Sequence, residues 1–152
     1  MKYLALAALL IATPALAETQ TADPFPVISP DGSLYQAFGG HDGLVRITDD
    51  LMVNVLADPR THDFFVAAKR DQIKTGLIQI FCHVMGGGCE YTGKDMTEAH
   101  SQLGIREEDF TALVESLQKA MDKNHVPFRA QNRLLAAMAP HHREIVTGPG
   151  KG

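Results

Sequence analysis

Residues 86–100 read GGGCEYTGKDMTEAH, and this stretch lies between long segments of helical periodicity. Three consecutive glycines predict a firm helix end, because glycine readily adopts the backbone conformations found there. The residues that follow show no hydrophobic period and predict a loop that turns at Gly93. Met96 and Leu103 then lie at helical spacing around His100, which predicts one or two helical turns with a histidine on an apolar face.

Helical periodicity dominates on both sides of this stretch. Apolar residues recur three or four positions apart, and no segment alternates as a strand would. The repeating residues are Leu44, Ile47, Leu51, Met52 and Val55, then Ile73, Leu77, Ile80, Phe81 and Val84, then Phe110, Leu113, Val114, Leu117 and Met121, and finally Leu134, Leu135 and Met138. With a short helix at 33–38 that the pair Gly39-Gly40 ends, the sequence predicts an all-α fold of about six helices.

The first 17 residues have the pattern of a bacterial secretory signal peptide. Lys2 gives a positive start, and residues 4–12 form an apolar run too short to span a bilayer. Ala15-Leu16-Ala17 fits a small-residue cleavage site. Cleavage after Ala17 predicts a periplasmic or secreted protein.

The composition of the chain limits the classes of protein to which it can belong. Apolar residues make up 45% of the 152 residues, which excludes a disordered chain, and a net charge of −4 argues against nucleic acid as a partner. No second long apolar stretch occurs, so we expect no membrane contact once the signal is removed. The predicted units are a signal peptide at 1–17, an extended leader at 18–32, a helical domain at 33–146 and a flexible tail at 147–152.

His100 has two interpretations from the residues alone. A histidine on an apolar face must satisfy two ring nitrogens. It is either a core histidine bonded to the backbone or an axial ligand to haem iron in an apolar pocket. No C-x-x-C-H sequence occurs, which excludes c-type haem attachment.

Several segments around His100 match one known family. The most specific block is Tyr91–Met96 (YTGKDM) with Ala99-His100 after it and Gly86-Gly87 before it. Further matching segments are Leu34–Gly40, Val55–Pro59, Phe64-Phe65, Leu103–Ile105 and Val126-Pro127. From Leu34 to Val146 the chain resembles the group I truncated haemoglobins, without gaps.

The resemblance implies a truncated globin fold, a two-over-two helical sandwich around one protohaem (haem b) per chain. His100 matches the proximal ligand of the iron, and Phe65 matches an aromatic residue that stacks on the haem. Tyr91 and Lys74 are candidates for holding the haem propionates through hydroxyl and ammonium groups. The other residues that the resemblance places around the cofactor are Leu77, Phe81, Met96, Ile105, Phe110, Leu113, Leu134 and Met138.

The distal pocket, where a gas ligand would lie, departs from the family pattern. The family usually has a Phe-Tyr pair whose tyrosine donates a hydrogen bond to bound O2, and this chain has Leu51-Met52. The other two distal positions usually carry a polar donor and here are Ile73 and Leu77. A hydrogen bond to a charged acceptor is worth about 1.5–3 kcal/mol. Without such a bond to the bound O2, we expect this chain to hold O2 about 10-fold to 100-fold less tightly than a family member that has the tyrosine. CO and NO depend less on such a donor.

The sequence is compatible with three functions. The favoured one is an exported haem protein that reversibly binds a diatomic gas (O2, NO or CO). A redox enzyme, such as a nitric-oxide dioxygenase or a peroxidase-like protein served by an electron donor, is less favoured because the distal side shows no acid–base group. An electron-transfer protein would need Met52 as a second axial ligand. We therefore expect a gas-binding protein more than an enzyme.

The other histidines are predicted to have ordinary roles. His41, His62 and His125 lie at expected corners and should be solvated. His83 lies off the apolar stripe of its helix, which predicts a surface position. His142 matches a region where some group I members bond a haem vinyl group, and a surface position is the alternative.

Cys82 and Cys89 bracket the glycine turn at 86–88. Export to an oxidising compartment would favour a disulfide between them. The alternative is a free thiol at Cys82, buried on its helix.

Overall fold

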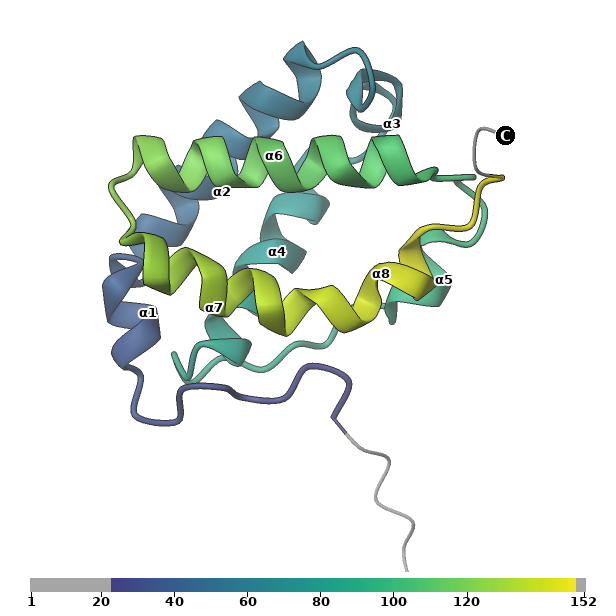
Figure 1. Ribbon diagram of the computed structural model, residues 1–152. Helices are drawn as coiled ribbons and strands as arrows, with labels where there is room; N and C mark the ends of the chain where they lie inside the picture. Colours follow the sequence, from purple (N-terminus) through teal and green to yellow (C-terminus); the bar gives the residue numbers. More distant parts are fainter. Residues whose placement is uncertain (1–22, 150–152) are drawn as a thin grey trace, which may run out of the picture.

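The computed structural model describes residues 23–149 and has no strand among them, which confirms the all-α prediction (Figure 1). Its main helices are α1 (Ser33–Ala37), α2 (Gly40–Ala57), α3 (His62–Val66), α4 (Arg70–Val84), α5 (Met96–His100), α6 (Glu107–Lys123) and α7 (Phe128–Met138). A 3-10 turn, η1 (Ala139–His141), and a short helix, α8 (His142–Ile145), continue α7. The helices outnumber the six expected, because the corner at α3 and the end of the chain each form a short helix. The predicted signal peptide at 1–17 lies outside the described residues.

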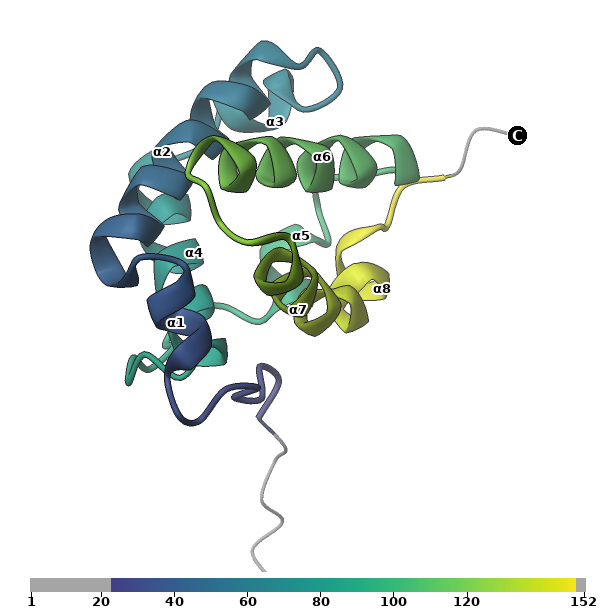
Figure 2. The same cartoon turned by 60° about the vertical axis from the view of Figure 1, so that its left-hand side comes forward.

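Four long helices form two crossing layers. α6 and α7 lie in front of α2 and α4 in Figure 1, and Figure 2 shows the same two pairs from the side. α2 packs against both α4 and α6. The side chains buried between the layers are Leu44, Ile47, Leu51, Val55, Ile80, Val84, Leu117, Met121 and Leu134. This is the two-over-two arrangement predicted from the sequence. No helix among residues 23–149 has the length and apolar character that crossing a membrane requires.

Polar side chains fix α2 against α6 at the crossing. Asp50 accepts hydrogen bonds from the Lys123 ammonium at 2.6 Å and from the Asn124 amide at 2.8 Å. The Asn54 amide donates to the Ser116 carbonyl at 2.9 Å. These bonds join residues far apart in sequence and so hold α2 and the end of α6 together.

The glycine pair between α1 and α2 divides two helices instead of simply ending one. Gly40 is the first residue of α2, so the second helix begins earlier than its apolar stripe indicated. A Cβ at Gly43 would lie 1.8 Å from the carbonyl oxygen of Phe38. Only glycine fits this position, and its small size lets α1 pack closely on the first turn of α2.

A disulfide joins Cys82 to Cys89 across the end of α4 and confirms the predicted bridge. Cys82 is fully buried, as the alternative expected, but it is not the free thiol of that alternative. A Cβ at Gly87 would lie 2.7 Å from the sulfur of Cys82 and 2.8 Å from the ring of Tyr35. The glycine turn therefore leaves the space in which the bridge packs, and the bridge fixes where the loop to α5 begins.

The segment before α1 is non-helical, as an extended leader should be, yet it packs into the core. Phe25 is only 2% exposed. The amide of Ile28 donates to the carbonyl of Val84 at 2.8 Å, and Arg133 donates to the carbonyl of Ile28 at 3.0 Å. We call residues 23–32 the strap; it runs along the lower edge of the molecule in Figure 1.

The segment expected as a flexible tail has backbone partners over its first residues. The amides of Thr147 and Gly148 donate to the carbonyl of Ile105 at 3.0 and 2.8 Å. These bonds join the end of the described chain to the residue pair that precedes α6, so the tail is fixed there at least as far as Gly148.

Candidate functional site

The short helix α5 presents His100 at one end of the bundle. Asp95 caps this helix, since its carboxylate accepts a hydrogen bond from the amide of Glu98 at 2.7 Å. α5 packs against α8, the last helix described. The Asp95 cap thus fixes the start of α5, and His100 lies at its end.

The hydrogen bonding of His100 defines which ring nitrogen is available. Its Nδ1 lies 2.8 Å from the carbonyl oxygen of Met96. A carbonyl oxygen only accepts, so Nδ1 carries the hydrogen, and in the neutral ring the lone pair is then on Nε2. Within residues 23–149 the structure records no hydrogen-bond partner for Nε2. A histidine that ligates a metal has the same arrangement: one ring nitrogen donates to a backbone acceptor, and the other offers its lone pair to the metal.

Most of the predicted cofactor-binding residues gather on one apolar cluster. Met52, Phe81 and Leu134 belong to the buried core. The residues that pack against this core while remaining half-buried are Phe65, Ile73, Leu77, Tyr91, Met96, Leu113 and Met138. His100 is half-buried as well. Large apolar side chains on several helices that face the core without being fully buried suit a flat apolar ligand between the layers.

Three of the predicted residues have other neighbours. Lys74 forms an ion pair with Asp49 of α2. Phe110 is half-buried and meets the ring of His142 edge-on, with ring centres 4.8 Å apart. Ile105 is half-buried next to the end of the chain. Both candidates for holding a propionate therefore already have a partner: the Lys74 ammonium pairs with Asp49, and the Tyr91 hydroxyl donates to the Lys94 carbonyl.

Tyr91 is held by a hydrogen bond and by an aromatic neighbour. Its hydroxyl donates to the carbonyl oxygen of Lys94 at 2.5 Å. Its ring meets Phe25 of the strap edge-on, with ring centres 5.3 Å apart. Burial raises the pKa of the Tyr91 phenol above its ordinary value, so the hydroxyl stays neutral at physiological pH.

The distal positions are apolar in the structure as in the sequence. Met52 on α2 is 6% exposed, and Ile73 and Leu77 on α4 are half-buried. None of the three side chains has a hydrogen to donate. Any ligand on this side would meet hydrocarbon and a thioether.

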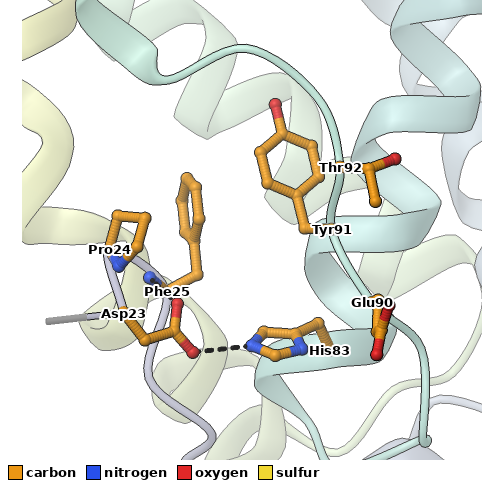
Figure 3. A pocket seen from close by; sticks show the side chains of 7 residues that line it. All are labelled: Asp23, Pro24, Phe25, His83, Glu90, Tyr91 and Thr92. Atoms are coloured by element: carbon orange, nitrogen blue, oxygen red, sulfur yellow. Dashed lines mark hydrogen bonds and ion pairs between the residues drawn. The ribbon is translucent and has the colours of Figure 1, made fainter. Parts of the chain in front are cut away.

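His83 is not the surface residue that its helix position predicted. Only 21% of its side chain is exposed, and both ring nitrogens have partners. Nδ1 lies 2.9 Å from the carbonyl oxygen of Cys89, and Nε2 lies 2.9 Å from the carboxylate of Asp23 (Figure 3). The hydrogen bond that His83 donates to the Asp23 carboxylate raises the pKa of His83, and the same contact lowers the pKa of Asp23.

The two histidines after α7 also have partners. His142 lies 2.8 Å from the carboxylate of Glu107. His141 is buried, bonds Glu144 at 2.9 Å and stacks on Phe25 with ring centres 4.3 Å apart. His142 therefore has two neighbours: the ring of Phe110, which is a predicted pocket residue, and the carboxylate of Glu107. The histidines predicted to be solvated, at positions 41, 62 and 125, are exposed.

Sequence reasoning missed the strap residues Asp23 and Phe25 and their contact with His83. One signal pointed to them: Phe25 is a large aromatic residue between two prolines in an otherwise polar leader. An apolar side chain in such a segment is a candidate for docking onto the domain, but its docking position depends on residues far along the chain.

Comparison with known proteins agrees with this geometry. The family model for bacterial-like globins matches residues 33–147. The group 1 truncated hemoglobin GlbN of Mycolicibacterium paratuberculosis is 32% identical over 116 residues, which is 76% of this chain and 85% of that protein. A group 1 truncated hemoglobin of Tetrahymena pyriformis is 27% identical over 76% of this chain and 95% of its own length.

Solved structures show the same fold. The Fe(III) form of truncated hemoglobin from Tetrahymena pyriformis superposes with a TM-score of 0.70 at 24% identity, covering 74% of this chain and 97% of that one. The 2/2 hemoglobin of Synechococcus sp. PCC 7002, solved with covalently attached heme, superposes with a TM-score of 0.68 at 22% identity and the same coverage. The chain therefore belongs to the bacterial-like globins, and among them to the group 1 truncated haemoglobins.

Membership of this family implies a haem protein, and the residues present fit that cofactor. Nε2 of His100 offers the basic nitrogen that haem iron takes as its proximal ligand. The half-buried apolar side chains around the core would form walls for the macrocycle, and Tyr91 packs against the same core with its hydroxyl donated to the Lys94 carbonyl.

Proposed function

We propose that this chain is an exported haem protein that carries one protohaem (haem b), ligated by His100, and reversibly binds a diatomic gas (O2, NO or CO). The observation that carries the proposal is the hydrogen bond from Nδ1 of His100 to the carbonyl of Met96, which leaves Nε2 with its lone pair. When bound, the haem supplies an iron atom with a coordination position for the gas. The chain supplies the ligand, the apolar walls and the exclusion of water.

The side chains around the cofactor divide the remaining tasks. Phe65 would stack on the macrocycle, and Tyr91 would donate its hydroxyl to a propionate. Tyr91 and Lys74, the two candidates for the propionates, would each exchange a present partner for the propionate, since Lys74 is paired with Asp49 and the Tyr91 hydroxyl donates to the Lys94 carbonyl. Met52, Ile73 and Leu77 would keep water away from the ligand side and donate no hydrogen bond to the gas. This arrangement favours rapid binding of CO and NO, which depend less on a hydrogen-bond donor, over long retention of O2.

Two features support export. The signal-like residues 1–17 end in an A-x-A cleavage site, and cleavage after Ala17 would leave the strap on the mature protein. The Cys82–Cys89 disulfide suits an oxidising compartment such as the periplasm. An electron donor that keeps the iron reduced would be a further partner of the mature protein.

The His100→Ala variant tests the haem assignment directly. It should lose haem or bind it weakly, and the ferrous absorption spectrum should change. His41→Ala is the matched control, because His41 is exposed in the first turn of α2 and should retain the wild-type spectrum. A His100→Ala protein with unchanged haem content and spectrum would remove the basis of the proposal.

The ferric spectrum of the wild-type protein separates gas binding from electron transfer. An open distal side predicts a high-spin ferric spectrum and fast CO binding. A low-spin spectrum with a thioether–iron charge-transfer band that disappears in Met52→Ala would assign Met52 as a second axial ligand and electron transfer as the function.

A further inference from the structure

The strap is fastened to the domain at both of its ends and in the middle. Near its start, the Asp23 carboxylate bonds Nε2 of His83 at 2.9 Å. In the middle, the backbone of Ile28 bonds Val84 and Arg133. At its end, residues 29–32 pass close to the glycine turn, since a Cβ at Gly86 would lie 1.9 Å from the carbonyl oxygen of Ser29. The strap is thus a fixed part of the fold beside the loop that leads to α5.

The Phe25 side chain of the strap enters between two other elements. Its ring lies against Tyr91, from the loop after α4, and against His141, from η1. Figure 3 shows the Phe25 and Tyr91 rings standing side by side, with the Asp23–His83 pair at their base. The ring is 2% exposed, so it fills the space between the loop and the end of α7 and η1.

Tyr91 is half-buried in the loop between α4 and α5. Of residues 90–95, all except Tyr91 are exposed. The loop starts at the Cys82–Cys89 bridge and ends at Asp95, which caps the helix that carries His100. Between these two fixed points, the position of the backbone depends on the packing of the Tyr91 ring, and the apolar partner of that ring is Phe25.

We propose that Phe25 is a positioning residue for Tyr91 and that the strap, by this contact, slows the escape of haem from the site. The haem part of this inference rests on the proposed function, in which the Tyr91 hydroxyl holds a propionate. Phe25 acts through Tyr91: its ring shields one side of the phenol ring from water and so helps to hold the loop in which the Tyr91 hydroxyl bonds the Lys94 carbonyl.

Two measurements on Phe25→Ala test this proposal. The first is the ultraviolet titration of the Tyr91 phenol in the haem-free protein, with Tyr91→Phe as the blank that removes the signal of the other tyrosines. Burial raises the pKa of this phenol, so exposing the ring should bring the pKa back toward its ordinary value of about 10. The second is the rate at which the haem-loaded protein loses haem to an excess of apomyoglobin. We expect this rate to rise about 10-fold, which corresponds to about 1.4 kcal/mol.

Matched variants separate positioning from general destabilisation. Val27→Ala removes an apolar side chain from the same strap, but Val27 is 40% exposed and should leave both measurements unchanged. Phe25→Leu keeps most of the apolar volume and should restore both toward wild-type values. Circular dichroism at each pH identifies the range in which every variant is folded.

Each outcome decides a stated point. An unchanged Tyr91 pKa in folded Phe25→Ala would overturn the positioning role. A lowered pKa with an unchanged rate of haem loss would overturn the haem-retention role. If the wild-type protein binds no haem through His100, the proposed function and the retention role both fall, while the titration still decides whether Phe25 positions Tyr91.

Discussion

Opening the Cys82–Cys89 bridge should destabilise the fold by a modest and calculable amount. The two cysteines are 7 residues apart in sequence, so the bond closes a short loop. In the chain-entropy treatment, closing a loop of this size lowers the entropy of the unfolded chain enough to be worth about 2.4 kcal/mol. For a chain of this length, that loss lowers the melting temperature by about 5–10 °C.

Reduction is a better perturbation than substitution for this measurement. Cys82 is fully buried and its sulfur lies close to Gly87, so replacing it would also change the packing. Reduction opens the bond and leaves the side chains almost the same size. We expect the melting curve followed by circular dichroism to shift down when a phosphine reductant is present. The Cys82→Ala/Cys89→Ala double variant is the control, because its melting curve should not respond to the reductant.

Two results would contradict this reasoning. Two free thiols in the unfolded, unreduced protein would mean that the bridge does not form. An unchanged melting temperature after complete reduction, with both thiols titrated, would mean that packing around the glycine turn fixes the loop and that the bond adds nothing. A reduced protein that also loses haem faster would show that the bridge helps to position the loop before α5.

Three further substitutions have expected outcomes. Met52→Tyr should slow O2 dissociation about 10-fold to 100-fold in stopped-flow measurements by restoring a hydrogen-bond donor, and an unchanged rate would disprove the donor argument. Asp95→Ala should cost about 1 kcal/mol in the urea-derived free energy of unfolding because α5 loses its cap, whereas Asp95→Asn should retain most of that stability. The Asp23–His83 pair raises the pKa of His83 and lowers that of Asp23, so its contribution is complete between about pH 4 and pH 6.5 and is lost as the pH rises through the raised pKa of His83. Asp23→Asn should therefore destabilise the protein more at about pH 5.5 than at about pH 9, and equal losses at both would contradict the pairing.

The amino-acid sequence by itself determined the fold class and indicated His100 as the residue that we propose to bind the haem iron. Helical stripes such as Leu44 to Val55 are local patterns, and their 3.6-residue period needs no knowledge of the partner helix. The block from Gly86 to His100 identified the family because its glycines, aromatic and histidine lie close together in sequence. The disulfide between Cys82 and Cys89 could be predicted for the same reason, since the two cysteines bracket one short turn.

Only the tertiary structure decided which side chains meet across the molecule. His83 was predicted at the surface, because its own helix could not reveal Asp23, 60 residues earlier in the chain. Phe25 was assigned to a leader outside the domain, yet its neighbours Tyr91 and His141 come from two distant segments. Contacts of this kind depend on the packing of the helices and not on local periodicity, which is why a single sequence without its fold leaves them undetermined.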